Sequence, residues 1–377
     1  MDNQPPLNIP AAQSDASSAK QSALSPDNRE RESQAIDLLR FFCVLFIIPL
    51  HCCFSHKVPI PPCDLVRTVE RFFCSFPSLN VLLFLSGFLF FRSVPTNWQF
   101  FSVLKKKLWR RISSLLVPYL LWTAVTFAAN CMFRTFPEGM EPSRPIDILR
   151  WIVGWDGWIS HPGGFGLWYI KSLFLAALLA PLYWFAFRLL GPTSILIGIF
   201  LCTHPPTPID YPLFSSPYFL GGALAFEKIS LEDLSKRTYR LFPVAGLAFA
   251  GWMFCKGINI KLPDFLAAIP YFFSIVLFSV CCHPKTKISA WLTEITRSST
   301  FVYFAHFFVS RAVGSALQFA IPLNSGRAAA AAYIIRVAGT VVLSISLFFA
   351  IRKLTPGIMS ALTGNRSRTK RRSEHST

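Results

Sequence analysis

Long apolar runs separated by short polar segments make up most of this chain. Ten of them are candidate membrane spans, because about 20 consecutive apolar residues cross the hydrocarbon core of a bilayer. Their approximate ranges are 36–56, 73–94, 112–133, 166–187, 193–203, 213–227, 241–256, 263–283, 299–321 and 328–352. The pattern therefore predicts an all-α fold: a polytopic helical bundle of about ten transmembrane helices in one membrane domain, residues 36–355.

The fifth and sixth runs are short, and the proline-rich segment HPPTPIDYP between them would end both helices. Eight spans plus a re-entrant pair are therefore the alternative. Residues 1–35, rich in Ser, Ala, Gln, Asp and Pro, are expected to form a disordered cytoplasmic tail, and residues 356–377 a basic cytoplasmic tail.

Composition agrees with a membrane protein. Of the 377 residues, 53% are hydrophobic and only 15% are charged, and the mean hydropathy is +0.44. A net charge of +18 would suggest nucleic acid in a soluble protein. Here most Lys and Arg fall in alternate connections, such as 105–111, 227–240 and 283–297. The positive-inside rule accounts for this asymmetry with both termini cytoplasmic, so we expect a lipid bilayer and no nucleic acid as partner.

The ten cysteines show no CxxC pair or other metal-ligand spacing, and we expect no metal. Cys52, Cys53, Cys63 and Cys74 fall around one predicted outer loop, where an oxidising compartment permits a disulfide. Small buried thiols are the favoured interpretation of these cysteines.

Two ionisable residues occur in the first run, RFFCVLFIIPLH. Arg40 and His51 are eleven residues apart, which is three helical turns with about 20° left over, so they share a helix face about 16 Å apart along the axis. Asp37 lies one turn before Arg40 and could orient it. Ionisable residues within spans usually serve function. The alternatives are an arginine that snorkels to the inner headgroups and an interfacial histidine.

A second basic feature, KKKLWRRISSLLVP, begins the third run. Membrane-surface anchoring accounts for its lysines, whereas Arg110 and Arg111 lie deeper. A guanidinium suits bidentate phosphate binding, so these two arginines are candidate anion ligands. Anchoring is an equally good interpretation of this pair.

Further candidates lie along the chain. His306 falls within the ninth run, either as a functional group or as a core histidine that hydrogen-bonds across helices. Ser86 and Gly87 form a small pair that favours close helix contact. The segment WIVGWDGWISHPGGFGLWY places Trp155 and Asp156 in an outer connection. Its tryptophans suit either stacking on a sugar ring or an interfacial aromatic belt.

Taken together, these motifs resemble the acyltransferase-3 family of integral membrane acyltransferases. The arginine, ten residues and histidine of the first run match the family's signature spacing. LFLSGFLFF, KKKLWRRISSLLVPY, FGLWYIKSLF, PYFLGGALAF and FVYFAHFFV resemble its later motifs in the same order. Some members carry a glutamate shortly after the tryptophan of the fourth motif. This chain has none there, so only Trp168 is carried over.

The resemblance implies transfer of an acyl group, most often acetyl, from an acyl-CoA donor to a hydroxyl of a carbohydrate or envelope glycan in a bacterial inner membrane. Arg40, Arg110 and Arg111 would bind the donor phosphates, and His51 would act as general base or acyl acceptor. Trp168, His306, Trp155 and Asp156 would contact the acceptor. A secondary transporter or flippase for a sugar or lipid-linked sugar is the alternative.

Overall fold

The computed structural model describes residues 26–52, 66, 69, 73, 78–95, 99–133, 145–147, 167–203, 216–229, 238–257, 260, 266, 268–281, 289–323 and 325–364. Within these ranges the chain is helical and contains no strand. The elements are α2 (Pro26–His51), α4 (Ser78–Phe91), α5 (Phe100–Arg111), η1 (Ile112–Leu116), α6 (Val117–Phe133), α8 (Leu167–Leu178), α9 (Ala180–Leu190), α10 (Thr193–Thr203), α11 (Ser216–Phe226), η3 (Tyr239–Leu241), α13 (Phe242–Gly257), α14 (Ala268–Cys281), α15 (Ala290–Thr296), α16 (Ser299–Ala320), α17 (Gly326–Leu354) and α18 (Pro356–Thr363).

Each of the ten predicted runs contains a helix, and the predicted all-α class is confirmed. Within the described part of the chain, three helical stretches are long and apolar enough to cross a membrane: Glu32–His51, Phe100–Met132 and Gly326–Leu354. The pair α8 and α9 makes a fourth if its bend of 58° is taken as a break within one span. Several others are shorter apolar helices, so the total of ten spans stays a prediction.

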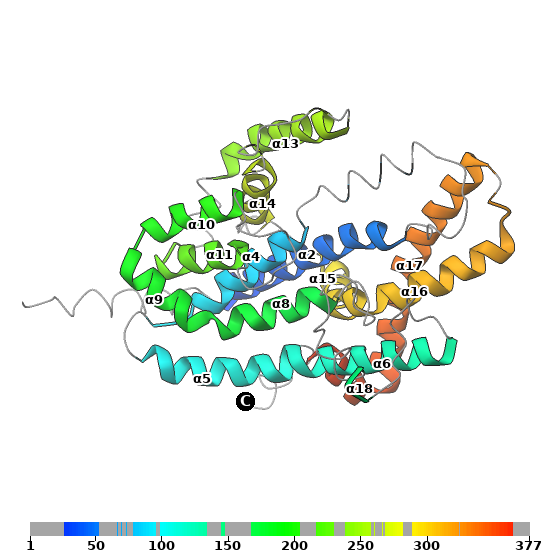
Figure 1. The fold of residues 1–377 in the computed structure, drawn as a ribbon, viewed down its shortest axis with the longest axis horizontal. Helices are drawn as coiled ribbons and strands as arrows, with labels where there is room; N and C mark the ends of the chain where they lie inside the picture. The colour runs from blue at the N-terminus through cyan, green and yellow to red at the C-terminus, as the bar shows by residue number, and fades with distance from the viewer. Residues whose placement is uncertain are drawn as a thin grey trace, which may run out of the picture.

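Helices α5, η1 and α6 form one continuous stretch along an edge of the bundle, with α13 and α14 towards the opposite edge (Figure 1). The stretch contains a π-helical segment at Ile112–Leu116, in which the Val117 N–H donates to the Ile112 carbonyl. Pro118 follows directly. Because proline has no N–H, the Ser114 carbonyl lacks its usual α-helical donor, and the wider π turn accommodates the defect.

Helix α9 begins one residue after the bend at Leu179 and carries Pro181 in its first turn. Proline is tolerated there because the first N–H groups of a helix have no internal partner. The same ring would disrupt an uninterrupted span, so the single predicted run 166–187 folds as two helices.

The core is built around a close contact of α4 and α11. A Cβ added at Gly87 would lie 2.0 Å from the Tyr218 carbonyl oxygen, and one at Gly221 would lie 2.1 Å from the Phe84 carbonyl oxygen. Glycine is therefore needed on both sides of the contact. The structure confirms the close helix contact predicted at Ser86 and Gly87.

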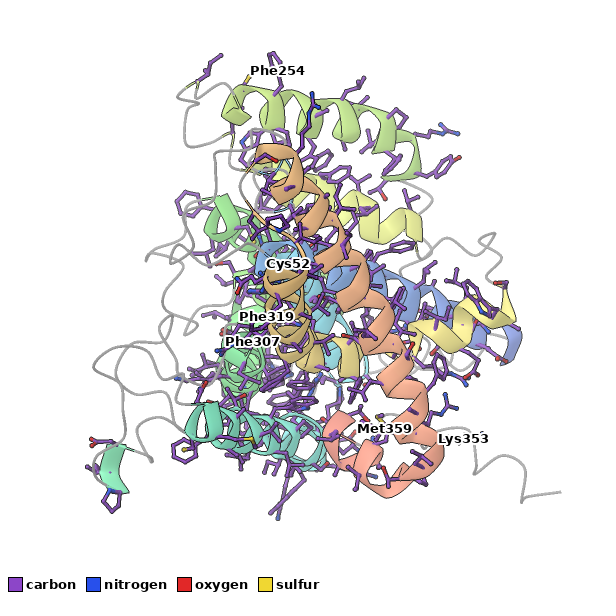
Figure 2. The ribbon with its side chains drawn as sticks, turned by 90° about the vertical axis from the view of Figure 1, so that its right-hand side faces the viewer. Cys52, Phe254, Phe307, Phe319, Lys353 and Met359 are labelled. Carbon is purple, nitrogen blue, oxygen red and sulfur yellow. The ribbon has the colours of Figure 1, made fainter. Side chains whose placement is uncertain are left out.

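Helix α18 lies within the segment expected to be a basic tail, and it packs on α6, α16 and α17. Its Met359 is buried close to the end of α17 that carries Lys353, whereas Phe254 on α13 and Phe319 on α16 are exposed (Figure 2). The Trp122 indole N–H donates to the Leu362 carbonyl at 3.2 Å. Residues 356–364 are thus part of the packed bundle.

Two groups of ion pairs join helix ends. Arg92 after α4 binds Glu32 near the start of α2 through both guanidinium nitrogens, one of them at 2.9 Å. Glu294 on α15 accepts from Arg352 on α17 at 3.1 Å and from Arg297. Desolvation alone would raise the pKa of the Glu294 carboxyl, but the two arginines outweigh it and lower that pKa.

Among the cysteines of the predicted outer loop, Cys52 is a buried free thiol, so the disulfide alternative is wrong for this residue. Cys53, Cys63 and Cys74 lie outside the described residues.

We expect Gly87→Ala to destabilise the protein by about 2 kcal/mol or more, because the new methyl group would meet backbone atoms that cannot rotate away. The matched control is Gly251→Ala on α13, where an added Cβ meets nothing within 4 Å. Thermal unfolding in detergent micelles measures both. Equal midpoints for the two variants would contradict the close α4–α11 contact.

Candidate active site

Arg40 lies on α2 where the sequence predicted a partner for it. Its guanidinium binds the Asp37 carboxylate one turn earlier at 3.2 Å. The two side chains remain about one-third exposed. Asp37 therefore orients Arg40 while leaving part of the guanidinium accessible.

Arg111, at the end of α5, is close enough to Arg40, Tyr169 and Tyr218 to interact with them electrostatically. Its guanidinium carbon lies 5.6 Å from the centre of the Phe90 ring. Within the described ranges the guanidinium forms no hydrogen bond and no ion pair. A partly buried cation beside a second arginine is unfavourable alone, so this pair is suited to an anionic ligand.

Arg110 is not brought to the same place. Its side chain is exposed on α5, two residues before the π segment. The structure therefore separates two adjacent arginines that the sequence treated as a pair, and Arg111 alone joins Arg40.

Lys107 shows that anchoring does not explain all three lysines of this motif. Its ammonium donates to the Phe90 carbonyl and lies 4.8 Å from the centre of the Phe90 ring. It thereby satisfies a carbonyl in the last turn of α4, one helical turn of α5 before Arg111. Lys107 thus fixes the distance between α5 and α4 beside the two arginines.

Tyr218, which sequence reasoning missed, lies on the other side of Arg111. It is fully buried at the α4–α11 contact. Its hydroxyl has no hydrogen-bond partner among the described residues. A buried hydroxyl without a partner is costly, and its position beside Arg111 makes it available to a bound polar group.

Aromatic side chains follow between Arg111 and the C-terminal end of α2, where His51 lies. Tyr169 of α8 meets Tyr303 of α16 edge to face, with ring centres 5.5 Å apart. The Tyr303 ring centre lies 6.0 Å from that of His306. Both tyrosines are buried.

His306 faces the predicted catalytic histidine. The ring centres of His51 and His306 are 5.2 Å apart, with the planes tilted by 41°. His306 is 1% exposed, whereas His51 is only partly buried. The sequence therefore placed both histidines within helices but gave no sign that they meet.

The backbone of α16 fixes the proton position on His306. Its Nδ1 lies 2.6 Å from the Tyr303 carbonyl oxygen and 3.2 Å from that of Val302. Carbonyls only accept, so Nδ1 carries the proton, and in the neutral ring Nε2 is an acceptor. Nε2 is buried and has no hydrogen-bond partner in the described part of the chain. It is thus available to a hydrogen-bond donor other than the described side chains.

The electrostatic interactions of Arg111 and the ring contacts of the tyrosines and histidines link six residues, which we call the arginine–histidine row: Arg40, Arg111, Tyr169, Tyr303, His306 and His51. Four helical elements contribute to it. It connects the two ionisable residues of α2 across the interior of the bundle, about 16 Å apart along the helix. The shared face predicted from their spacing is therefore directed at protein, and not at lipid.

Three predicted acceptor residues cannot be placed in this row. Trp168 lies in the first turn of α8, beside Tyr169, but its side chain lies outside the described atoms. Trp155 and Asp156 lie outside the described residues altogether.

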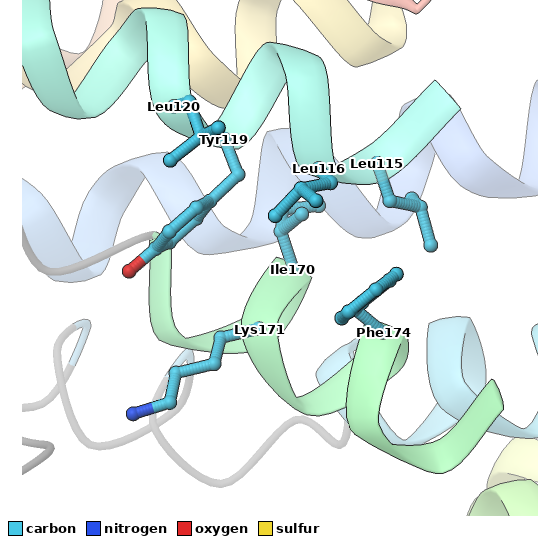
Figure 3. A pocket seen from close by; sticks show the side chains of 7 residues that line it. All are labelled: Leu115, Leu116, Tyr119, Leu120, Ile170, Lys171 and Phe174. Atoms are coloured by element: carbon cyan, nitrogen blue, oxygen red, sulfur yellow. The ribbon is translucent and has the colours of Figure 1, made fainter. Parts of the chain in front are cut away.

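A separate apolar cavity of about 210 Å³ lies between η1, α6 and α8. Figure 3 shows Lys171 and the Tyr119 hydroxyl directed towards one end and Leu115 and Phe174 towards the other. The lining is completed by Leu116, Leu120 and Ile170. In the described ranges no group of three or more metal-ligating side chains occurs.

A helical membrane protein that encloses a histidine pair and links it to basic side chains has the features of a membrane enzyme. The comparison with known families is decisive: the acyltransferase-3 model, described as an acyltransferase domain, matches residues 33–351. The chain belongs to this family and is a membrane acyltransferase. The match favours this class over the transporter alternative. No curated protein and no solved structure matches the chain significantly.

The unpaired Arg111 yields a prediction about stability. Without ligand, we expect Arg111→Met to stabilise the protein by roughly 1 kcal/mol, because an apolar side chain of similar length replaces a partly buried cation beside Arg40. Arg110→Met, on the exposed side of α5, should leave the midpoint of thermal unfolding unchanged. Destabilisation by Arg111→Met in the ligand-free protein would contradict the assignment of an uncompensated charge.

Proposed function

We propose that this acyltransferase moves an acyl group, with acetyl favoured, from a cytoplasmic acyl-CoA donor to a hydroxyl of a carbohydrate or envelope glycan. The arginine–histidine row carries the proposal. It joins a basic site beside the middle of α2 to an imidazole pair at the C-terminal end of that helix. On this proposal the protein works in the bacterial inner membrane, with its basic connections on the cytoplasmic side.

The basic end suits an anionic donor. The Arg40 and Arg111 guanidinium groups repel each other unless a negative group lies between them, and guanidinium binds phosphate through paired hydrogen bonds. Among the described residues, the Tyr218 hydroxyl is a further polar group near Arg111 without a hydrogen-bond partner. These residues fit the phosphates of coenzyme A, whose long thin arm would then extend past Tyr169 and Tyr303 towards the histidines.

At the other end, His51 would take the proton from the acceptor hydroxyl while the hydroxyl oxygen bonds to the acyl carbon and the carbon–sulfur bond breaks. The proton then passes from His51 to the departing thiolate. In a second route a His51 nitrogen attacks the acyl carbon as the carbon–sulfur bond breaks, and the thiolate leaves with the imidazole proton. The acceptor hydroxyl oxygen then attacks the acyl carbon, the carbon–nitrogen bond breaks, and the hydroxyl proton returns to the imidazole. In either route the His306 Nε2 lone pair, buried next to His51, holds a donated hydrogen bond during proton transfer.

The acceptor would approach from the outer side. Trp155, Asp156 and Trp168 are the proposed contacts there, with stacking of an indole ring on a sugar as the physical basis. The aromatic belt is the competing role for these tryptophans.

His51→Ala should lower the rate of acyl transfer about 10²-fold or more, because no base then remains at the acceptor hydroxyl. Mass spectrometry of envelope polysaccharides from cells that produce either form measures acyl incorporation. The variant must be inserted in the membrane and unfold at the wild-type temperature for the comparison to hold. Undiminished acylation by such a variant would remove His51 from the reaction.

Arg111→Lys should raise the KM for the donor about tenfold, because a point charge lacks the planar fork that holds phosphate, and a charged hydrogen bond contributes about that much. Arg110→Lys is the matched control, since the neighbouring arginine is exposed. Steady-state kinetics with acetyl-CoA measure the KM of each variant. Equal KM values for the two variants would contradict donor binding at Arg111.

A further inference from the structure

The last turn of α2 is attached to the neighbouring helices through its carbonyl groups. Pro49 lies inside the helix, and its carbonyl accepts from the Cys52 N–H at 3.2 Å. The Tyr333 hydroxyl of α17 donates to the Pro49 carbonyl at 3.1 Å. The Ser310 hydroxyl of α16 donates to the His51 carbonyl at 3.1 Å. Side chains from two other helices thus hold the backbone that carries His51.

Ser310 is in turn held by Arg336, a residue of α17 that is 8% exposed. The Arg336 Nε–H reaches the Ser310 carbonyl oxygen at 3.0 Å and the Ser310 Oγ at 3.1 Å. Arginine has no acceptor. The Ser310 hydroxyl therefore accepts from Arg336, and its own proton is directed to the His51 carbonyl or to the Cys52 Sγ at 3.5 Å, both at the C-terminal end of α2.

The fold leaves space for this guanidinium. A Cβ added at Gly314, one turn after Ser310 on α16, would lie 2.8 Å from the Arg336 Cζ and 2.9 Å from its Nε. Any larger residue at Gly314 would displace Arg336. An arginine within a membrane helix is costly, which argues that its position serves a purpose.

The same face of α16 carries His306, four residues before Ser310. One helix face thus contacts His51 twice, through the His306 ring and through the Ser310 hydroxyl. The position of Ser310 consequently affects the orientation of the His51 ring relative to the His306 ring.

We propose that Arg336 is a positioning residue: through its Nε–H and Ser310 it fixes the His51 backbone and so aligns the His51 ring with His306. This inference rests on the proposed function, in which His51 acts on the acceptor hydroxyl. Arg336 lies at the opposite end of the row from Arg40 and Arg111, so it affects turnover and leaves donor affinity unchanged.

Substitutions at position 336 can remove the positive charge and either keep a hydrogen-bond donor or remove it as well. Glutamine places an amide nitrogen the same number of bonds from Cα as the arginine Nε, and methionine places a methyl group there. We expect Arg336→Met to lower kcat about 10-fold to 100-fold, as a small misplacement of a catalytic group does, with an unchanged KM for acetyl-CoA. Arg336→Gln should restore most of the lost kcat. Equal losses in the two variants would overturn the assigned role of the Nε–H donor.

Ser310→Ala tests the same link where Arg336 variants fold poorly, because it removes one hydroxyl. It should reproduce the kcat loss of Arg336→Met. The double variant should lose no more kcat than the single variant with the larger loss. Ser344→Ala on α17 is the control, since the Ser344 hydroxyl is buried without a hydrogen-bond partner among the described residues. A Ser310→Ala enzyme with wild-type kcat, or losses that multiply in the double variant, would overturn the inference.

The two proposals fail differently. If His51→Ala is inactive while Ser310→Ala and Arg336→Met retain wild-type kcat, only the positioning role is wrong. If His51→Ala still transfers the acyl group, the proposed function and the positioning role are both overturned.

Discussion

The contact between the last turn of α2 and one face of α16 is the interaction on which the rest of the site depends. It brings His306 to 5.2 Å from His51, ring centre to ring centre, and it joins Ser310 to the His51 carbonyl. Imidazole rings and open carbonyls are unfavourable next to lipid. Enclosing them between helices removes that cost and also creates a polar interior in which proton transfer is feasible. Stability and chemistry therefore require the same packing.

Beside Arg40, near the middle of α2, the requirements diverge. Arg40 has Asp37 as a partner, whereas Arg111 lies over an aromatic ring and interacts electrostatically with two tyrosines. The close approach of α4 and α11 at Gly87 and Gly221 keeps Tyr218 beside Arg111. A site that holds cations without enough anions is less stable than an apolar one, and such strain is typical of positions kept for a ligand.

Sequence reasoning succeeded where a local rule applies. Hydrophobic run length located the helices, and helical periodicity placed Arg40 and His51 on one face. It failed where the answer depends on packing between distant segments. Arg110 and Arg111 look alike in sequence, but the orientation of α5 buries only the second. Tyr169, Tyr218 and Tyr303 look like ordinary aromatic residues of a membrane helix, and Arg336 looks like an isolated charge. The only available signal was the rarity of arginine within a span.

One measurement tests the central claim, that a single row connects donor binding at the arginines to chemistry at the histidines. It is the structure of the full-length protein, determined by electron cryo-microscopy, with a non-hydrolysable acyl-CoA analogue bound. The account requires phosphate density within hydrogen-bonding distance of Arg40 and Arg111, and the sulfur end of the analogue beside His51 and His306. An analogue bound instead in the cavity lined by Leu115 and Phe174, or with its phosphates away from Arg111, would contradict it.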